Sequence, residues 1–159
     1  MKETFTNIPP KHNKFNILST ETINLNQETK EVVKNTLQSL NSYISSINLK
    51  INTINNLYKS NNILHAEYKL SSTVEMIDLF IQLTSSIYNT SKINFKKTYS
   101  LSEDIHKLKI ELYSLIKAIG SERQNKNFIM LCDLLECNVK DNLTQWKIKT
   151  IPALKEIWK

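Results

Sequence analysis

The sequence predicts an all-α protein, an antiparallel up-and-down four-helix bundle, and two observations carry this prediction. The 159 residues include one glycine and three prolines, so few of the residues that build tight hairpins are present. Apolar side chains, mostly Ile and Leu, recur every three or four positions from Val33 onward, which places them on one face of a helix. Because a chain of this length can bury one core, we expect a single bundle domain.

The domain boundary is expected near residue 25. Residues 1–25 are polar, contain Pro9 and Pro10 and show no sustained period, so they predict an extended or mobile N-terminal arm. Residues 26–159 carry the helical pattern and form the predicted bundle. Its helices are expected at about 27–58, 63–90, 101–119 and 125–149, followed by a short C-terminal helix at 152–158.

The first predicted helix gives the strongest signal. Asn and Ser flank its apolar stripe and are poor helix formers, so tertiary packing rather than propensity must stabilise it. The 3.5-residue spacing predicts left-handed crossings of about +20° between helices, and pairing of the stripe with a second chain, as a homodimer, is the alternative. The stripe consists of Val33, Leu37, Leu40, Ile44, Ile47, Ile51, Ile54 and Tyr58.

Helix start and stop signals delimit the later elements. Ser100 and Glu103 match a capping box at the start of the third helix, and Gly120 is expected as its left-handed C-terminal cap. Pro152 has no backbone N–H for a helix interior, so it either kinks the fourth helix or begins a short helix capped by Thr150. We favour the short helix.

Charge and cysteine content bear on partners and location. The formal charge is +6, but the lysines are mostly scattered and Arg123 is the only arginine, which disfavours bidentate phosphate contacts. No secretory signal is evident, and residues 74–88, the most apolar stretch, are interrupted by charges, so we expect no membrane span. Cys132 and Cys137 point in different directions on one helix and are interpreted as reduced thiols, which favours a cytoplasmic location.

Signals for catalysis, cofactors and metals are weak. Glu103 and His106 have the Glu-x-x-His spacing of di-iron bundles, but the second copy that such a centre needs does not appear in the sequence. One glycine cannot build a phosphate-binding loop, and no serine or cysteine lies at a recognisable nucleophile elbow. We therefore predict no catalytic, cofactor-binding or metal-binding residue, and keep an enzyme with an unrecognised site as an alternative.

Two segments near the C-terminus carry a resemblance. Residues 127–136, Asn-Phe-Ile-Met-Leu-Cys-Asp-Leu-Leu-Glu, and residues 152–158, Pro-Ala-Leu-Lys-Glu-Ile-Trp, resemble the C-terminal signature of small uncharacterised helical proteins of low-GC Gram-positive bacteria. In that signature the Pro and Trp follow closely, whereas residues 137–151 separate the two halves here. The resemblance implies a helical fold and no assigned activity.

These features favour a non-enzymatic protein-interaction module, an adaptor or a chaperone-like bundle that holds a partner's helix in an interhelical groove. The partner is expected to be another protein, for example an acidic one, or a second copy of the chain. The residues expected to contact it combine aromatic and basic character near helix ends: Phe95, Lys96, Lys97, Trp146 and Trp158.

The alternative partner is nucleic acid or an anionic surface, bound by lysines that alternate with aromatic residues. The lysines concerned are Lys92, Lys96, Lys97, Lys140, Lys147, Lys149, Lys155 and Lys159.

Overall fold

The computed structural model describes the backbone of residues 15–94 and 99–159 and the side chains of residues 27–92 and 101–159. The chain divides into two compact units, Met1–Val32 and Val33–Lys159, and the second holds the core. The helices are α1 (Phe15–Lys59), α2 (Ile63–Asn94), α3 (Tyr99–Gln124), α4 (Phe128–Asp133), α5 (Lys140–Gln145) and α6 (Ile151–Ile157), with π-helical turns η1 (Leu134–Val139) and η2 (Trp146–Thr150) between the last three. The described residues contain no strand, which confirms the all-α fold.

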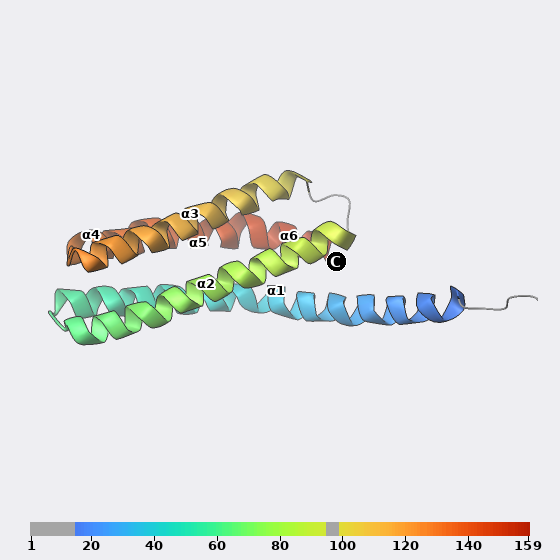
Figure 1. Cartoon of the computed structure of the whole chain (residues 1–159), viewed down its shortest axis with the longest axis horizontal. Helices are drawn as coiled ribbons and strands as arrows, with labels where there is room; N and C mark the ends of the chain where they lie inside the picture. The colour runs from blue at the N-terminus through green and yellow to red at the C-terminus, as the bar shows by residue number, and fades with distance from the viewer. Residues whose placement is uncertain (1–14, 95–98) are drawn as a thin grey trace, which may run out of the picture. The chain divides into compact units, whose positions relative to one another are not determined.

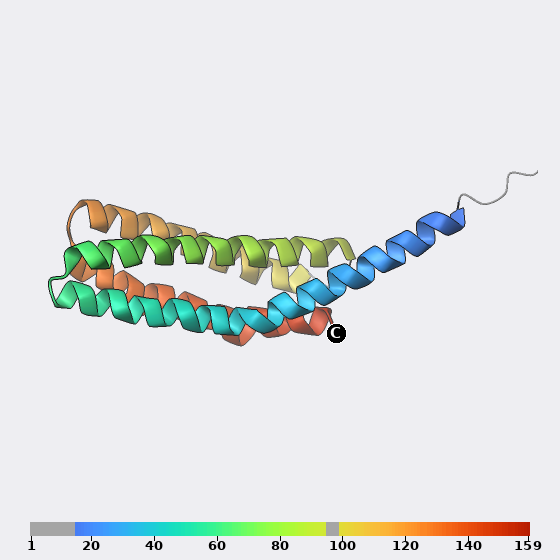
Figure 2. The same cartoon turned by 90° about the horizontal axis from the view of Figure 1, so that it is seen from below.

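Within Val33–Lys159, α1 and α2 form one hairpin, and α3 and the stretch from α4 to α6 form the other (Figures 1 and 2). The two turns lie at the same end of the bundle (Figure 1). Two contacts show that the last stretch runs antiparallel to α1: Asn55 bonds Glu136 near the turns, and Lys34 bonds the carbonyl of Lys159 at the other end. The predicted antiparallel up-and-down four-helix bundle is confirmed.

The apolar stripe of α1 forms the centre of the core. All eight side chains predicted for it, from Val33 to Tyr58, are buried. Burying an aliphatic side chain of this size contributes about 1.5–3 kcal/mol, which offsets the poor helix propensity of the flanking Asn and Ser residues. One aromatic contact of the core joins α2 to η2, where the rings of Phe80 and Trp146 meet edge to face with their centroids 5.3 Å apart.

The turn after α3 differs from the expected one. Gly120 was predicted to end the helix in a left-handed conformation, and this is wrong: α3 continues to Gln124, and Lys126 adopts the positive φ of 56° instead. The extra turn brings Arg123 to Glu67 of α2, where the two form an ion pair. Asn127 then caps α4 by accepting a hydrogen bond from the backbone N–H of Met130.

The beginnings of α1 and α3 concern two predictions, the N-terminal arm and the capping box of the third helix. An extended or mobile arm was expected for residues 15–25; they belong to α1 and so are not extended, and no Gly or Pro interrupts this stretch. Residues 1–14 lie outside the described residues, as does the side chain of Ser100. The capping box with Glu103 therefore stays a prediction.

The predicted short C-terminal helix at 152–158 corresponds to α6, but it is not separate from the preceding helix and Thr150 does not cap it. The chain is helical without a break from Phe128 to Ile157, and Thr150 has helical φ and ψ and makes no capping hydrogen bond. The reason lies in η2, where the N–H of Ile151 donates to the carbonyl of Trp146, five residues back. This widened turn shifts the hydrogen-bond register just before Pro152, so the missing donor of the proline does not end the helix.

Among the described residues, no helix has both the length and the hydropathy that crossing a bilayer requires.

We predict that Trp146→Ala lowers the free energy of unfolding by about 3–5 kcal/mol, because the indole is fully buried. Ile148→Ala, in the same π-helical turn but 58% exposed, is the matched control and should change it by less than about 0.5 kcal/mol. Urea unfolding followed by circular dichroism measures both. A small effect of Trp146→Ala would contradict its place in the core.

Candidate functional site

One cavity is a groove between the end of α1 and the beginning of the fourth helical stretch, which we call the α1–α4 groove. Its volume is about 420 Å³. A smaller cavity of about 200 Å³ adjoins it and shares Lys59, Cys132 and Asp133 with it. The larger cavity is lined by Asn52, Asn55, Asn56, Lys59, Cys132, Asp133 and Glu136, and the smaller adds Tyr58, Phe128 and Ile129.

The π-helical turn η1 forms part of the groove wall. Here the N–H of Lys140 donates to the carbonyl of Leu135, five residues back, so the turn is wider than in an α-helix. Leu135 and Val139 remain in the core, while Glu136 between them projects towards α1. Such π turns occur often at functional sites because they redirect side chains within a helix.

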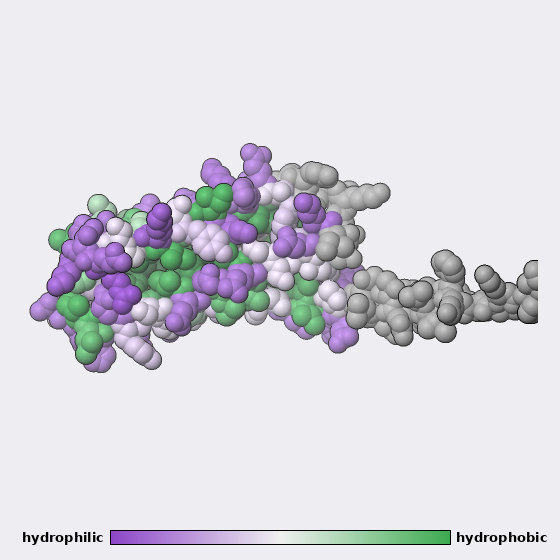
Figure 3. Space-filling view, in the orientation of Figure 1, coloured by the Kyte–Doolittle hydropathy of each residue, from purple (hydrophilic) through white to green (hydrophobic). Residues whose placement is uncertain are grey.

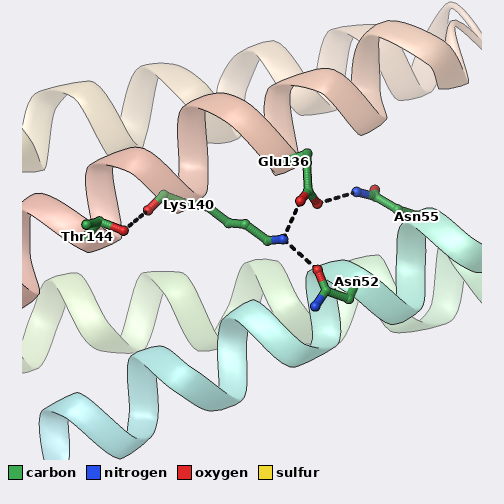
Figure 4. Close-up of polar contacts among 5 residues, drawn as sticks. All are labelled: Asn52, Asn55, Glu136, Lys140 and Thr144. Carbon is green, nitrogen blue, oxygen red and sulfur yellow. Dashed lines mark hydrogen bonds and ion pairs between the residues drawn. The ribbon is translucent and has the colours of Figure 1, made fainter.

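A polar network crosses the groove from η1 to α1 (Figure 4). Glu136 accepts a hydrogen bond of 2.9 Å from the amide of Asn55 and one of 2.6 Å from the ammonium of Lys140. The same ammonium donates to the amide oxygen of Asn52 at 2.5 Å. Because the Glu136 side chain is half exposed, its ion pair adds little stability, and its main effect is to orient the two asparagines.

Asn55 is the most buried polar residue of the groove, with 6% of its surface exposed. Its amide nitrogen is bonded to Glu136, but its amide oxygen is buried without a hydrogen-bond partner. A buried acceptor in this state costs about 1–3 kcal/mol. Because that oxygen has almost no accessible surface, it lies within the groove wall and not on its surface.

The lining of the groove includes the thiol of Cys132. Burial raises the pKa of the Cys132 thiol, Asp133 and Glu136 raise it further, and Lys59 opposes them. The thiol is therefore protonated at neutral pH and is a poor nucleophile. Within the part of the chain that the structure describes, no group of three His, Cys, Asp or Glu residues is placed to hold a metal ion.

Tyr58 closes the end of the smaller cavity. Its ring stacks on Phe128 at 4.8 Å, and its hydroxyl donates to Glu67 at 2.6 Å. Burial and this hydrogen bond raise the pKa of Tyr58. Since Glu67 also pairs with Arg123, this network holds the ends of α1, α2 and α3 in place.

A second group of partly exposed apolar side chains lies on α2 and α3, and we call it the α2–α3 face: Leu79, Leu83, Ile110 and Tyr113. Leu79, Ile110 and Tyr113 are 47%, 49% and 44% exposed, and Leu83 is half-buried. The two helices are held side by side by Glu67 with Arg123 at one end and by Lys109 with Ser85 further along. Figure 3 shows apolar side chains between them, bordered by hydrophilic ones.

The predicted partner-contact residues are not brought together on a surface. Trp146 and Trp158 are buried, so this prediction is wrong for both: the helical register that places aromatic residues beside lysines turns the rings inward. The indole N–H of Trp158 donates to the hydroxyl of Ser91 at 2.7 Å. Phe95, Lys96 and Lys97 lie outside the described residues.

The remaining candidates are dispersed. Glu103 and His106 are both exposed on α3. Of the lysines considered for nucleic acid, Lys140 is engaged by Glu136 and Lys159 by Glu156, whereas Lys147 and Lys149 are exposed in η2.

Sequence reasoning treated the groove asparagines only as polar flanks of the α1 stripe. The signal that could have indicated the π turn is the spacing of Leu131, Leu135, Val139 and Leu143, which are separated by three successive steps of four. An α-helix has 3.6 residues per turn, so such a run drifts off one face unless a turn widens.

Comparison with known proteins gives one match. The model of the family described as "Domain of unknown function (DUF8042)" matches residues 35–149, most of the bundle. No curated protein matches, and no solved structure matches.

We predict that alkylation of Cys132 by iodoacetamide, measured in a Cys137→Ser variant, has its pH midpoint above that of the same chain unfolded in urea. The fold raises the pKa of this thiol, so the reactive thiolate forms only at higher pH in the folded protein. Mass spectrometry of quenched samples gives the rate. Equal midpoints in the folded and unfolded chains would show that Cys132 is not shielded.

Proposed function

We propose that the chain, which belongs to the DUF8042 family, is a non-enzymatic protein-interaction module of the adaptor or chaperone-like kind, and that its α2–α3 face receives an amphipathic helix of a partner protein. The observation that carries the proposal is the row of partly exposed apolar side chains along two neighbouring antiparallel helices. The proposal includes a cytoplasmic location, in keeping with two free thiols.

The first support is that α2 is apolar on two sides. Its inward face supplies Leu70, Ile77 and Ile81 to the core, and its outward face still carries Leu79, which is 47% exposed. A helix that is apolar beyond its buried face packs against more than one neighbour. Within the described bundle, nothing covers the outward side.

The second support is alignment across the two helices. On α2, Leu79 lies between Glu67 and Ser85; on α3, Tyr113 lies between their partners, Arg123 and Lys109. Leu79 and Tyr113 are therefore at the same level of the bundle. Apolar residues at one level of two adjacent helices suit contact with the apolar side of a third helix.

To test this, a photo-reactive benzoylphenylalanine is placed at position 79 or 113 and irradiated in cells. We expect both positions to yield the same crosslinked product, because both side chains would contact one partner helix. Position 49 is the matched control, since Leu49 is also apolar and 68% exposed but belongs to α1. A product with twice the mass of the chain would identify the partner as a second copy.

The double variant Leu79→Ser/Tyr113→Ser should lose the partner in affinity capture while keeping its circular dichroism spectrum, because half-exposed side chains contribute little to folding. Leu49→Ser/Ile148→Ser removes two exposed apolar side chains elsewhere and should retain the partner. Crosslinks that are identical from positions 49, 79 and 113, or absent from all three, would count against the proposed function.

A further inference from the structure

We propose that the α1–α4 groove is a second binding site, which takes a short extended polypeptide segment: asparagine side chains hydrogen-bond its main chain, and the smaller cavity holds one of its apolar side chains. The site is distinct from the α2–α3 face and goes beyond the proposed function.

The asparagine side chains of the groove offer both a hydrogen-bond donor and a hydrogen-bond acceptor to a peptide group. Asn52 uses its oxygen to accept from Lys140 and so turns its amide NH₂ to other partners. Asn56, which is exposed one turn beyond Asn52, offers a carboxamide oxygen as well as an NH₂. A peptide group has one acceptor and one donor, which match a carboxamide NH₂ and a carboxamide oxygen.

The smaller cavity fits the side chain of such a segment. Its wall is the stacked pair Tyr58 and Phe128, and Ile129, which is 81% exposed, stands at its edge. Burying one Val, Leu or Ile side chain there would contribute about 1.5–3 kcal/mol. Because the two cavities share Lys59, Cys132 and Asp133, the apolar anchor and the amide contacts would be made by neighbouring residues of one segment.

Charge and backbone chemistry favour a neutral, extended occupant over a charged group or a helix. Lys59 and Asp133 balance each other in the lining, and Glu136 is already paired with Lys140. A helix satisfies its own main chain and has no use for carboxamides, whereas an extended segment presents unpaired N–H and C=O groups. From residue 128 to residue 136 the wall spans about 12 Å, the length of roughly three or four extended residues.

The experiment uses a phage-displayed library of random heptapeptides, selected on the full-length chain, and synthetic copies of the recovered peptides. We expect the sequences to share one aliphatic position. In fluorescence polarisation, Asn52→Leu/Asn56→Leu should weaken binding about tenfold, as expected for the loss of two hydrogen bonds. Asn35→Leu/Asn89→Leu, which alters two exposed asparagines outside the groove, should leave it unchanged.

Two further readouts separate main-chain recognition in the groove from other binding modes. N-methylation of single peptide amides should weaken binding at one or two positions, which a helical ligand contacted by its side chains would not show. Saturating peptide should slow alkylation of Cys132, in the groove wall, and leave the exposed Cys137 unaffected.

Several results would overturn the inference: no peptide recovered, equal binding to the Asn52→Leu/Asn56→Leu variant, or unchanged alkylation of Cys132. If binding is lost instead in Leu79→Ser/Tyr113→Ser, the peptides recognise the α2–α3 face, and the groove inference fails while the proposed function stands. Conversely, peptide binding in the groove together with absent crosslinks at positions 79 and 113 would remove the proposed function alone.

Discussion

Burial of the α1 stripe is the constraint on which the described bundle depends. The residues beside the stripe are mainly Asn and Ser, which favour turns and caps over helix interiors, so α1 has little tendency to be helical by itself. The aliphatic side chains of the stripe from Leu37 to Ile54 are at most 1% exposed, because they pack against the other helical stretches. Packing therefore stabilises the helix, and the same packing sets one wall of the α1–α4 groove, because Asn52 and Asn55 directly follow stripe residues.

The π-helical turns η1 and η2 keep the apolar residues of the fourth helical stretch on its inward face. Its apolar residues advance in steps of four from Leu131 to Leu143, and in an ideal α-helix each such step turns about 40° too far. The wide turn η1 absorbs part of this excess, and η2 does the same before Pro152. One physical device thus keeps Leu135 and Trp146 in the core, carries the helix past a proline, and directs Glu136 into the groove.

The fold could be predicted because it follows from local patterns in the sequence. An apolar stripe of a helix is visible as a regular spacing of apolar residues, and an all-helical chain with two short turns can pack its helices in few ways. The groove could not, because Asn55 and Glu136 are distant in sequence and meet only once the register of both helices is fixed. The same limit explains the error at Trp146 and Trp158. Lysines beside a tryptophan describe its sequence neighbours, whereas burial depends on the face of the helix, and in both cases the ring lies on the inward face.

The two proposed binding sites differ in the chemistry that they offer. The α2–α3 face presents apolar surface without a row of amides, which suits a ligand whose main chain is already satisfied. The α1–α4 groove presents amides, and the raised pKa values keep Cys132 as a thiol and Tyr58 as a phenol. The carboxylate of Glu136 is held by Lys140. The two proposals therefore call for different ligands, a helix on the α2–α3 face and an extended segment in the α1–α4 groove.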